Sequence, residues 1–180
     1  MGLGLALGAL WGFAEATLFF IVPDVGLTLL AILGPEEAWA GCMAAIGGAI
    51  LGGAAMYAWG ARADARARDV LLRIPAIDAR EIAGVRRSLA HSGFGAVFLG
   101  PLKGTPYKLY AVEVGRRRLS LFRFLVISVP ARGIRFAVAT SVALWLVGGP
   151  LAAWTPGALA ALAVGFWVVF YVGYFHLKSR

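Results

Sequence analysis

The sequence predicts an all-α membrane protein, a helical bundle in which two re-entrant helical hairpins form an inverted-topology repeat. The 180-residue chain is 61% hydrophobic, and its mean hydropathy is +0.81. Only 14% of its residues are charged, against roughly 25% in a soluble domain. Several of these charges lie inside apolar stretches, where an unpaired ionisable group is costly. We therefore expect one membrane domain over residues 1–180 with a polar centre.

Residues 1–60 are predicted to form the first hairpin and a spanning helix. The apolar stretch 3–22 is separated from the apolar stretch 25–33 by Pro23-Asp24. The second stretch is too short to cross the bilayer, which takes ~20 residues. A long apolar segment over 38–60 then meets that length. In the alternative interpretation, residues 3–22 span the membrane fully and residues 25–33 are a short re-entrant or interfacial piece.

Residues 61–92 form a basic connector that is expected to be cytoplasmic, because basic residues flank spans on that side. Asp78 followed by Glu81 is typical of a capping box, and Gly93 suits a helix end. An apolar stripe at helical spacing lies between them: Ile82, Val85 and Leu89. The pattern predicts a basic amphipathic helix at the membrane interface, or a surface helix packed on the bundle.

Residues 93–149 are predicted to form the second hairpin and its spanning helix. The apolar stretch 93–114 is interrupted between Gly100 and Pro106, and both of its flanks are basic. If both flanks are cytoplasmic, the stretch enters the membrane and returns. Residues 119–149 then cross outward, with tilt or with a break near Pro130.

Residues 150–180 are predicted to contain the last spanning helix, over 152–176, which returns to a cytoplasmic end at Lys178 and Arg180. The two hairpins would enter from opposite faces, as in inverted-repeat transporters. The net charge of +8 lies beside hydrophobic segments. We attribute it to positive-inside bias and anionic lipid headgroups and expect no nucleic-acid partner.

Three acids lie within the two predicted hairpins. Glu15 and Asp24 are candidates for proton coupling, because burial favours the protonated form of a carboxyl group. The alternatives are a structural ion pair for Glu15 and a helix cap or loop acid for Asp24. Glu113 is interpreted as a headgroup-level partner of Arg116 and Arg117, with an acid inside the membrane as the less favoured alternative.

Four bases are candidates for binding a phosphate. Lys103 and Lys108 flank the Gly/Pro break of the second hairpin, where free amides and ammonium groups favour a phosphate or carboxylate. Arg132 and Arg135 are three residues apart, so they share a helix face, and a guanidinium matches phosphate oxygens in pairs. Alternatively the lysines extend to the interface, and the arginines pair with Glu15 or Asp24 as a static lock.

No pattern in the sequence indicates an enzyme or a metal site. His91 and His176 are far apart, and the spacings of zinc-protease, serine-hydrolase and phosphate-loop motifs are absent. We therefore predict no catalytic residue, no metal and no cofactor.

The order of these features resembles the DedA family, also called the SNARE-associated Golgi or VTT domain, over about residues 10–150. The resemblance rests on five groups of residues: Glu15 with Pro23-Asp24; Gly48, Gly52, Tyr57 and Gly60; His91-Ser92-Gly93; Lys103, Pro106 and Lys108; and Val114-Gly115 followed by Phe122 or Phe124. Where the family usually has an arginine pair, this chain has lysines, with the second about one position closer to the proline.

Family members are implicated in moving polyprenyl phosphates or phospholipids between leaflets, with proton coupling in bacteria. The resemblance thus implies a flippase for an anionic, phosphate-bearing lipid in a bacterial inner membrane, with protons and lipid as partners and a homo-oligomer left open. Two alternatives remain: a passive scramblase or structural membrane-assembly protein with a static buried lock, and, less favoured, an intramembrane enzyme acting on lipid.

Overall fold

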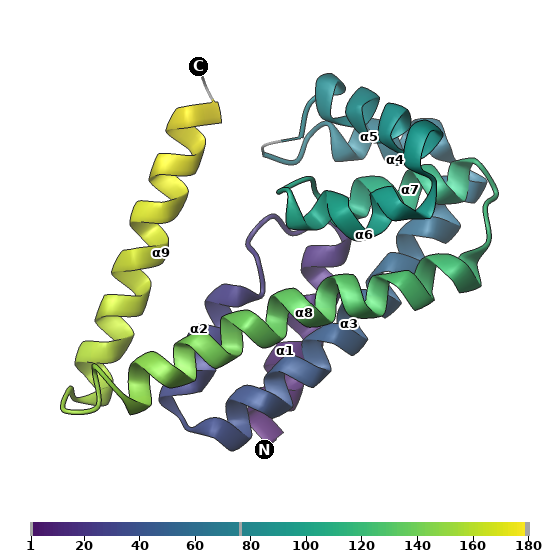
Figure 1. Ribbon diagram of the computed structural model, residues 1–180. Helices are drawn as coiled ribbons and strands as arrows, with labels where there is room; N and C mark the ends of the chain where they lie inside the picture. The colour runs from purple at the N-terminus through teal and green to yellow at the C-terminus, as the bar shows by residue number, and fades with distance from the viewer. Residues whose placement is uncertain (1, 76, 179–180) are drawn as a thin grey trace.

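The computed structural model describes residues 2–75 and 77–178, and every regular element in these ranges is a helix (Figure 1). The all-α prediction is confirmed. Arg180 and the side chain of Lys178 lie outside the described part. The helices are α1 (Gly2–Thr17), α2 (Asp24–Ile32), α3 (Pro35–Arg62), α4 (Asp64–Leu71), α5 (Ala79–Ser92), α6 (Phe94–Leu102), α7 (Tyr107–Arg116), α8 (Leu121–Gly148) and α9 (Pro156–Lys178).

Both predicted interruptions are present. α1 ends at Thr17, so residues 3–22 do not form one continuous helix. Its 16 residues correspond to about 24 Å, which is less than the ~30 Å thickness of a bilayer core. The second interruption separates α6 from α7 between Lys103 and Pro106. In contrast, α8 continues through Pro130, where the sequence had left a break open.

Two helices of the described chain, α3 and α9, are long and apolar enough to cross a membrane. They differ in how much of their surface is covered. About 44% of the apolar window of α3 is buried inside the protein, against 6% for α9. α9 therefore presents an apolar surface that the rest of the described chain leaves open.

The two halves of the chain repeat one order of helices and one pattern of packing. Each half has two short helices followed by a helix of 28 residues, α1-α2-α3 and α6-α7-α8. The first short helix of each half packs on the long helix of its own half, as α1 on α3 and α6 on α8. The second short helix packs on the long helix of the other half, as α2 on α8 and α7 on α3. The packing is thus preserved when the halves are exchanged.

Small residues allow α1 and α3 to approach closely along most of α1. A Cβ atom added at Gly8 would overlap the carbonyl oxygen of Gly41, and one at Gly12 would overlap that of Ala45. Backbone contact of this kind is the usual basis of helix association in membranes. It also holds the C-terminal end of α1, which carries Glu15, in a fixed position.

The connector folds into α4 and α5. The Asp78 carboxylate accepts a hydrogen bond of 2.8 Å from the Glu81 amide, and Gly93 ends the helix with a φ of +53°. The predicted helix and its caps are therefore confirmed. Val85 and Leu89 are buried against the bundle, which supports the packed-surface interpretation. The sequence reasoning missed α4, whose Ala67 and Leu71 are buried.

Candidate functional site

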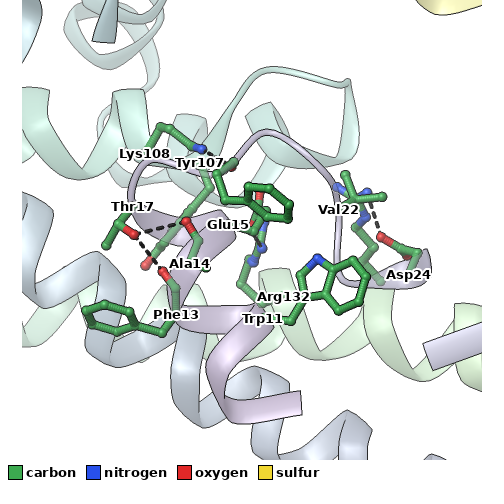
Figure 2. A network of polar contacts seen from close by, with 12 residues as sticks. Trp11, Phe13, Ala14, Glu15, Thr17, Val22, Asp24, Tyr107, Lys108 and Arg132 are labelled. Atoms are coloured by element: carbon green, nitrogen blue, oxygen red, sulfur yellow. Dashed lines mark hydrogen bonds and ion pairs between the residues drawn. The ribbon is translucent and has the colours of Figure 1, made fainter. Parts of the chain in front are cut away.

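The two helix breaks meet at one place in the bundle. The chain between α1 and α2 passes over the start of α7, where the Lys108 ammonium donates a hydrogen bond of 2.6 Å to the Phe19 carbonyl oxygen. The other break turns at Gly104. Its φ of +88° is rarely adopted by residues that carry a Cβ atom. Figure 2 shows Lys108 and Tyr107 reaching the same space as Glu15 and Arg132. The breaks thus bring groups from α1, α7 and α8 together.

Glu15 and Arg132 form a buried ion pair between α1 and α8. Arg132 is 1% exposed, and its guanidinium lies over the rings of Tyr107 and Phe136, 5.0 and 4.8 Å from their centroids. The two rings hold the cation by cation–π attraction. The Tyr107 hydroxyl is also within hydrogen-bonding distance of the Ser128 hydroxyl, at 2.9 Å. The position of Arg132 is therefore fixed from several sides.

Asp24 and Arg135 form a second ion pair, 2.8 Å long, between α2 and α8. Asp24 is buried in the first turn of α2, where a negative charge is favoured by the helix dipole. Pro23, not Asp24, occupies the N-cap position. Both predicted acids are therefore paired with the predicted arginines in this conformation.

Lys108 is the cation of this cluster that forms no ion pair of its own. It is 2% exposed, and among the described residues it forms no ion pair. The cluster has three bases, Lys108, Arg132 and Arg135, against the two acids Glu15 and Asp24. One positive charge is therefore not balanced by a carboxylate in the described part of the chain.

Hydrogen-bond donors in the cluster are also incompletely used. The Nε atom of Arg132 is buried and has no acceptor among the described residues. An ammonium group has three donors, and the structure gives that of Lys108 the Phe19 carbonyl as an acceptor. Buried donors without acceptors are unusual and call for an explanation. An anion bound beside Lys108 and Arg132 would supply both the charge and the acceptors.

A cavity of about 180 Å³ lies beside these groups. It is lined by Glu15, Lys108, Arg132 and Arg135, and by Tyr171 of α9. A water molecule occupies about 30 Å³ in the liquid, so the cavity has room for a phosphate-sized group. Its charged wall and its position at both helix breaks make it the candidate binding site.

Lys103 does not line this cavity. Its exposed side chain borders a separate cavity of about 510 Å³ beside α5, together with Arg80, Ser88 and Tyr110. Thr105 lies between the two spaces and lines both. Of the four bases predicted to bind phosphate, the structure thus groups Lys108, Arg132 and Arg135, and places Lys103 apart.

Glu113 belongs to a different cluster, at the end of α7. Its carboxylate accepts hydrogen bonds from Arg86, Arg116 and Arg117 at 3.2, 2.5 and 3.0 Å. Burial alone would raise the pKa of Glu113, but the bonds from Arg116 and Arg117 hold that pKa below its ordinary value. The cluster connects α5 to α7 through Arg86 and Glu113, which agrees with the interpretation of Glu113 as a partner of neighbouring arginines.

Comparisons with protein-family models, with curated proteins and with solved structures found no match to this chain. Within the described ranges, no group of three or more His, Cys, Asp or Glu residues is placed to hold a metal ion.

Proposed function

We propose that the protein is a membrane transporter that moves an anionic, phosphate-bearing lipid, a polyprenyl phosphate or a phospholipid, between leaflets, with coupling to protons. The observation that carries this proposal is the buried Lys108 ammonium, which faces a cavity and has no acidic partner among the described residues. Burying such a charge is costly unless an anion compensates it. The lipid phosphate is that anion.

The phosphate is bound by Lys108, Arg132 and Arg135. Arginine presents a planar fork to phosphate oxygens, and lysine acts as a point charge. The unused Nε donor of Arg132 lies on the same side chain that pairs with Glu15. We propose that the ligand takes, besides this free donor, the Nη2 donor that Glu15 accepts from, so that it competes with Glu15 for this guanidinium.

Proton coupling follows from that competition. When phosphate takes Arg132 and Arg135, the carboxylates of Glu15 and Asp24 lose their cations. A carboxylate without a partner in an apolar environment binds a proton to avoid the cost of burial. When the phosphate leaves, each acid releases its proton and returns to its arginine. Lipid movement and proton movement are thereby linked.

The proposed architecture is an inverted repeat with two re-entrant hairpins, α1-α2 and α6-α7, in the bacterial inner membrane. Two findings support the repeat: the broken helices and the exchange-symmetric packing. The membrane location is supported by α3 and α9, which are long and apolar enough to span. In such transporters the substrate site lies where the broken helices meet. The site between the broken helices, together with the order of the sequence motifs described above, supports the proposal that the chain belongs to the DedA family.

A passive scramblase with a static lock is the second candidate. It is favoured by the finding that both acids are paired with arginines in this conformation. Transport of a phosphate lipid in proteoliposomes, measured with and without a pH gradient, separates the two. We expect a gradient to drive net accumulation in one leaflet. Equal movement in both directions, with or without the gradient, would support the scramblase instead.

A further inference from the structure

An apolar groove lies between α2, α8 and α9. Its volume is about 600 Å³, which is within the usual range for a small-molecule site of ~300–1,000 Å³. Its walls are almost entirely hydrocarbon, and the charged residue among them is Asp24. The walls include Val142 and Leu146 of α8 and Leu162, Ala163 and Phe166 of α9. The groove is thus a space for an apolar chain.

α9 forms the groove by diverging from α8. Figure 1 shows the two helices close together at the turn between them and far apart at the other end of α9. α9 is held to the rest of the protein through the first hairpin. The Trp167 indole donates to the Thr28 hydroxyl at 2.9 Å, and the Tyr171 hydroxyl accepts from the Val22 amide at 2.9 Å. The space between α8 and α9 is therefore not closed by helix packing.

The groove adjoins the charged cavity. Asp24 lines the groove, and its partner Arg135 lines the cavity that contains Lys108. α9 borders both spaces, with Phe166 and Trp167 at the groove and Phe170 and Tyr171 at the cavity. The Asp24–Arg135 pair thus lies between a polar, cationic space and an apolar one. That sequence of environments matches an amphiphile with an anionic head.

The dimensions fit a chain lying in one leaflet. The groove follows α8 from Ala139 to Val147, which is about 12 Å at 1.5 Å per residue. One leaflet contributes about 15 Å of hydrocarbon. The exposed outer surface of α9, which includes Val169 and Val172, would face the same hydrocarbon. A lipid could therefore enter the groove sideways from the bilayer.

We propose that this groove holds the hydrocarbon chain of the lipid whose phosphate lies against Lys108, so that head and tail occupy adjoining sites. The inference rests on the proposed function, because it takes the phosphate site as given. It adds that the protein recognises the chain as well as the headgroup. Phosphate compounds with long chains should then bind more tightly than the same headgroup on a short chain.

The test fills the groove without touching the charged cavity. Ala163→Phe places a ring inside the groove, and Ala161→Phe places the same ring on the exposed face of α9 as a matched control. On the facing wall, Val142→Phe repeats the comparison on α8, and its control is Val126→Phe, which places the same ring on another, exposed face of α8. Binding is measured with a long-chain and a short-chain polyprenyl phosphate.

We expect Ala163→Phe and Val142→Phe to weaken binding of the long-chain phosphate about tenfold or more, because each methylene kept out of an apolar site loses affinity. Short-chain binding should stay within twofold, and both control variants should bind like the wild type. In contrast, Lys108→Met should weaken binding of both compounds. Unchanged long-chain affinity in folded Ala163→Phe and Val142→Phe would overturn the groove assignment and leave the phosphate site standing.

A photoreactive group at the chain end gives a readout on the wild-type protein. Cross-links to residues 139–147 of α8 or 159–167 of α9 support the assignment, and cross-links only elsewhere overturn it. If the groove instead holds a second copy of this chain, Ala163→Phe would change the oligomeric state and leave lipid affinity unaltered, which also overturns it. If Lys108→Met fails to weaken binding of either compound, the proposed function fails, whatever the groove variants show.

Discussion

Lys108→Met is the most direct test of the phosphate site. The substitution removes the charge and keeps a long, unbranched side chain. Because the structure gives Lys108 no acidic partner, no carboxylate is left unpaired. The Phe19 carbonyl loses its donor, which costs about 1–3 kcal/mol. The substitution also removes the desolvation cost of the buried cation, which offsets this loss. We therefore expect the free energy of unfolding to change by less than about 2 kcal/mol.

The effect on binding should be much larger. A hydrogen bond to a charged group contributes about 1.5–3 kcal/mol, and each 1.4 kcal/mol is a factor of ten in affinity. We therefore expect Lys108→Met to weaken binding of a polyprenyl phosphate by about 10- to 150-fold. The measurement is a titration in nanodiscs, with the uncharged polyprenol as the comparison ligand, whose binding should stay unchanged.

Lys103→Met is the matched control, because Lys103 is exposed and lines the other cavity. It should bind the phosphate lipid within about twofold of the wild type. The reasoning is refuted if folded Lys108→Met binds the phosphate lipid as tightly as the wild type. It is also refuted if Lys103→Met loses as much affinity as Lys108→Met, since the buried position would then carry no special role.

Three further predictions use other parts of the chain. In a Cys42→Ala background, cysteines at positions 90 and 116 should be labelled from the same face, and a cysteine at position 152 from the opposite face; labelling of 90 and 116 from opposite faces would remove the re-entrant hairpin α6-α7. Glu15→Gln should abolish the pH dependence of transport in the protein that accumulates in membranes, and it should lower the unfolding free energy by about 3–5 kcal/mol because it leaves the buried Arg132 without its carboxylate; Glu15→Asp should keep part of the pH dependence, and normal pH dependence in Glu15→Gln would make Glu15 structural. Because the pKa of Glu113 is lowered by its arginines, the stability it contributes is present above the unfolded pKa and is lost as the pH falls through the folded pKa. Glu113→Gln should therefore lower the unfolding free energy at pH 7 by about 1–3 kcal/mol and flatten its decline on the acid side, whereas an unchanged acid limb would contradict this role.

The breaks in the helices could be predicted because they depend on local chemistry. Proline lacks a backbone donor and restricts the residue before it, and Pro23, Pro101 and Pro106 lie at or beside the two interruptions. The cap at Asp78 is equally local. These features require only a few neighbouring residues, so the sequence located the start of α2, the second interruption and the Asp78 cap. It did not locate the end of α1, which comes at Thr17, six residues before Pro23, and α8 continues through Pro130.

The pairing of charges could not be predicted in the same way. The sequence offered Glu15 and Asp24 as partners for two arginines but gave no order, since the pairs join residues 117 and 111 positions apart. The Lys108 ammonium donates to a backbone carbonyl oxygen, and every residue has one, so this acceptor could not be identified from residue types. Tyr107 was missed because its role depends on where Arg132 packs. In the sequence, Lys103 and Lys108 flank the same Gly/Pro break and are equivalent candidates. In the structure, the turn between them places them at different cavities.

The division of charge between the two halves explains how one movement could affect both acids. The helices on either side of the first break, α1 and α2, supply the carboxylates, α7 supplies Lys108, and α8 supplies both arginines. Arg132 and Arg135 are three residues apart on one helix, so a shift of α8 against α1 and α2 would strain both ion pairs together. Buried ion pairs contribute little net stability, yet breaking one by removing a partner costs several kcal/mol. Under the proposed function, we therefore expect the two pairs to break together when a phosphate binds at Lys108.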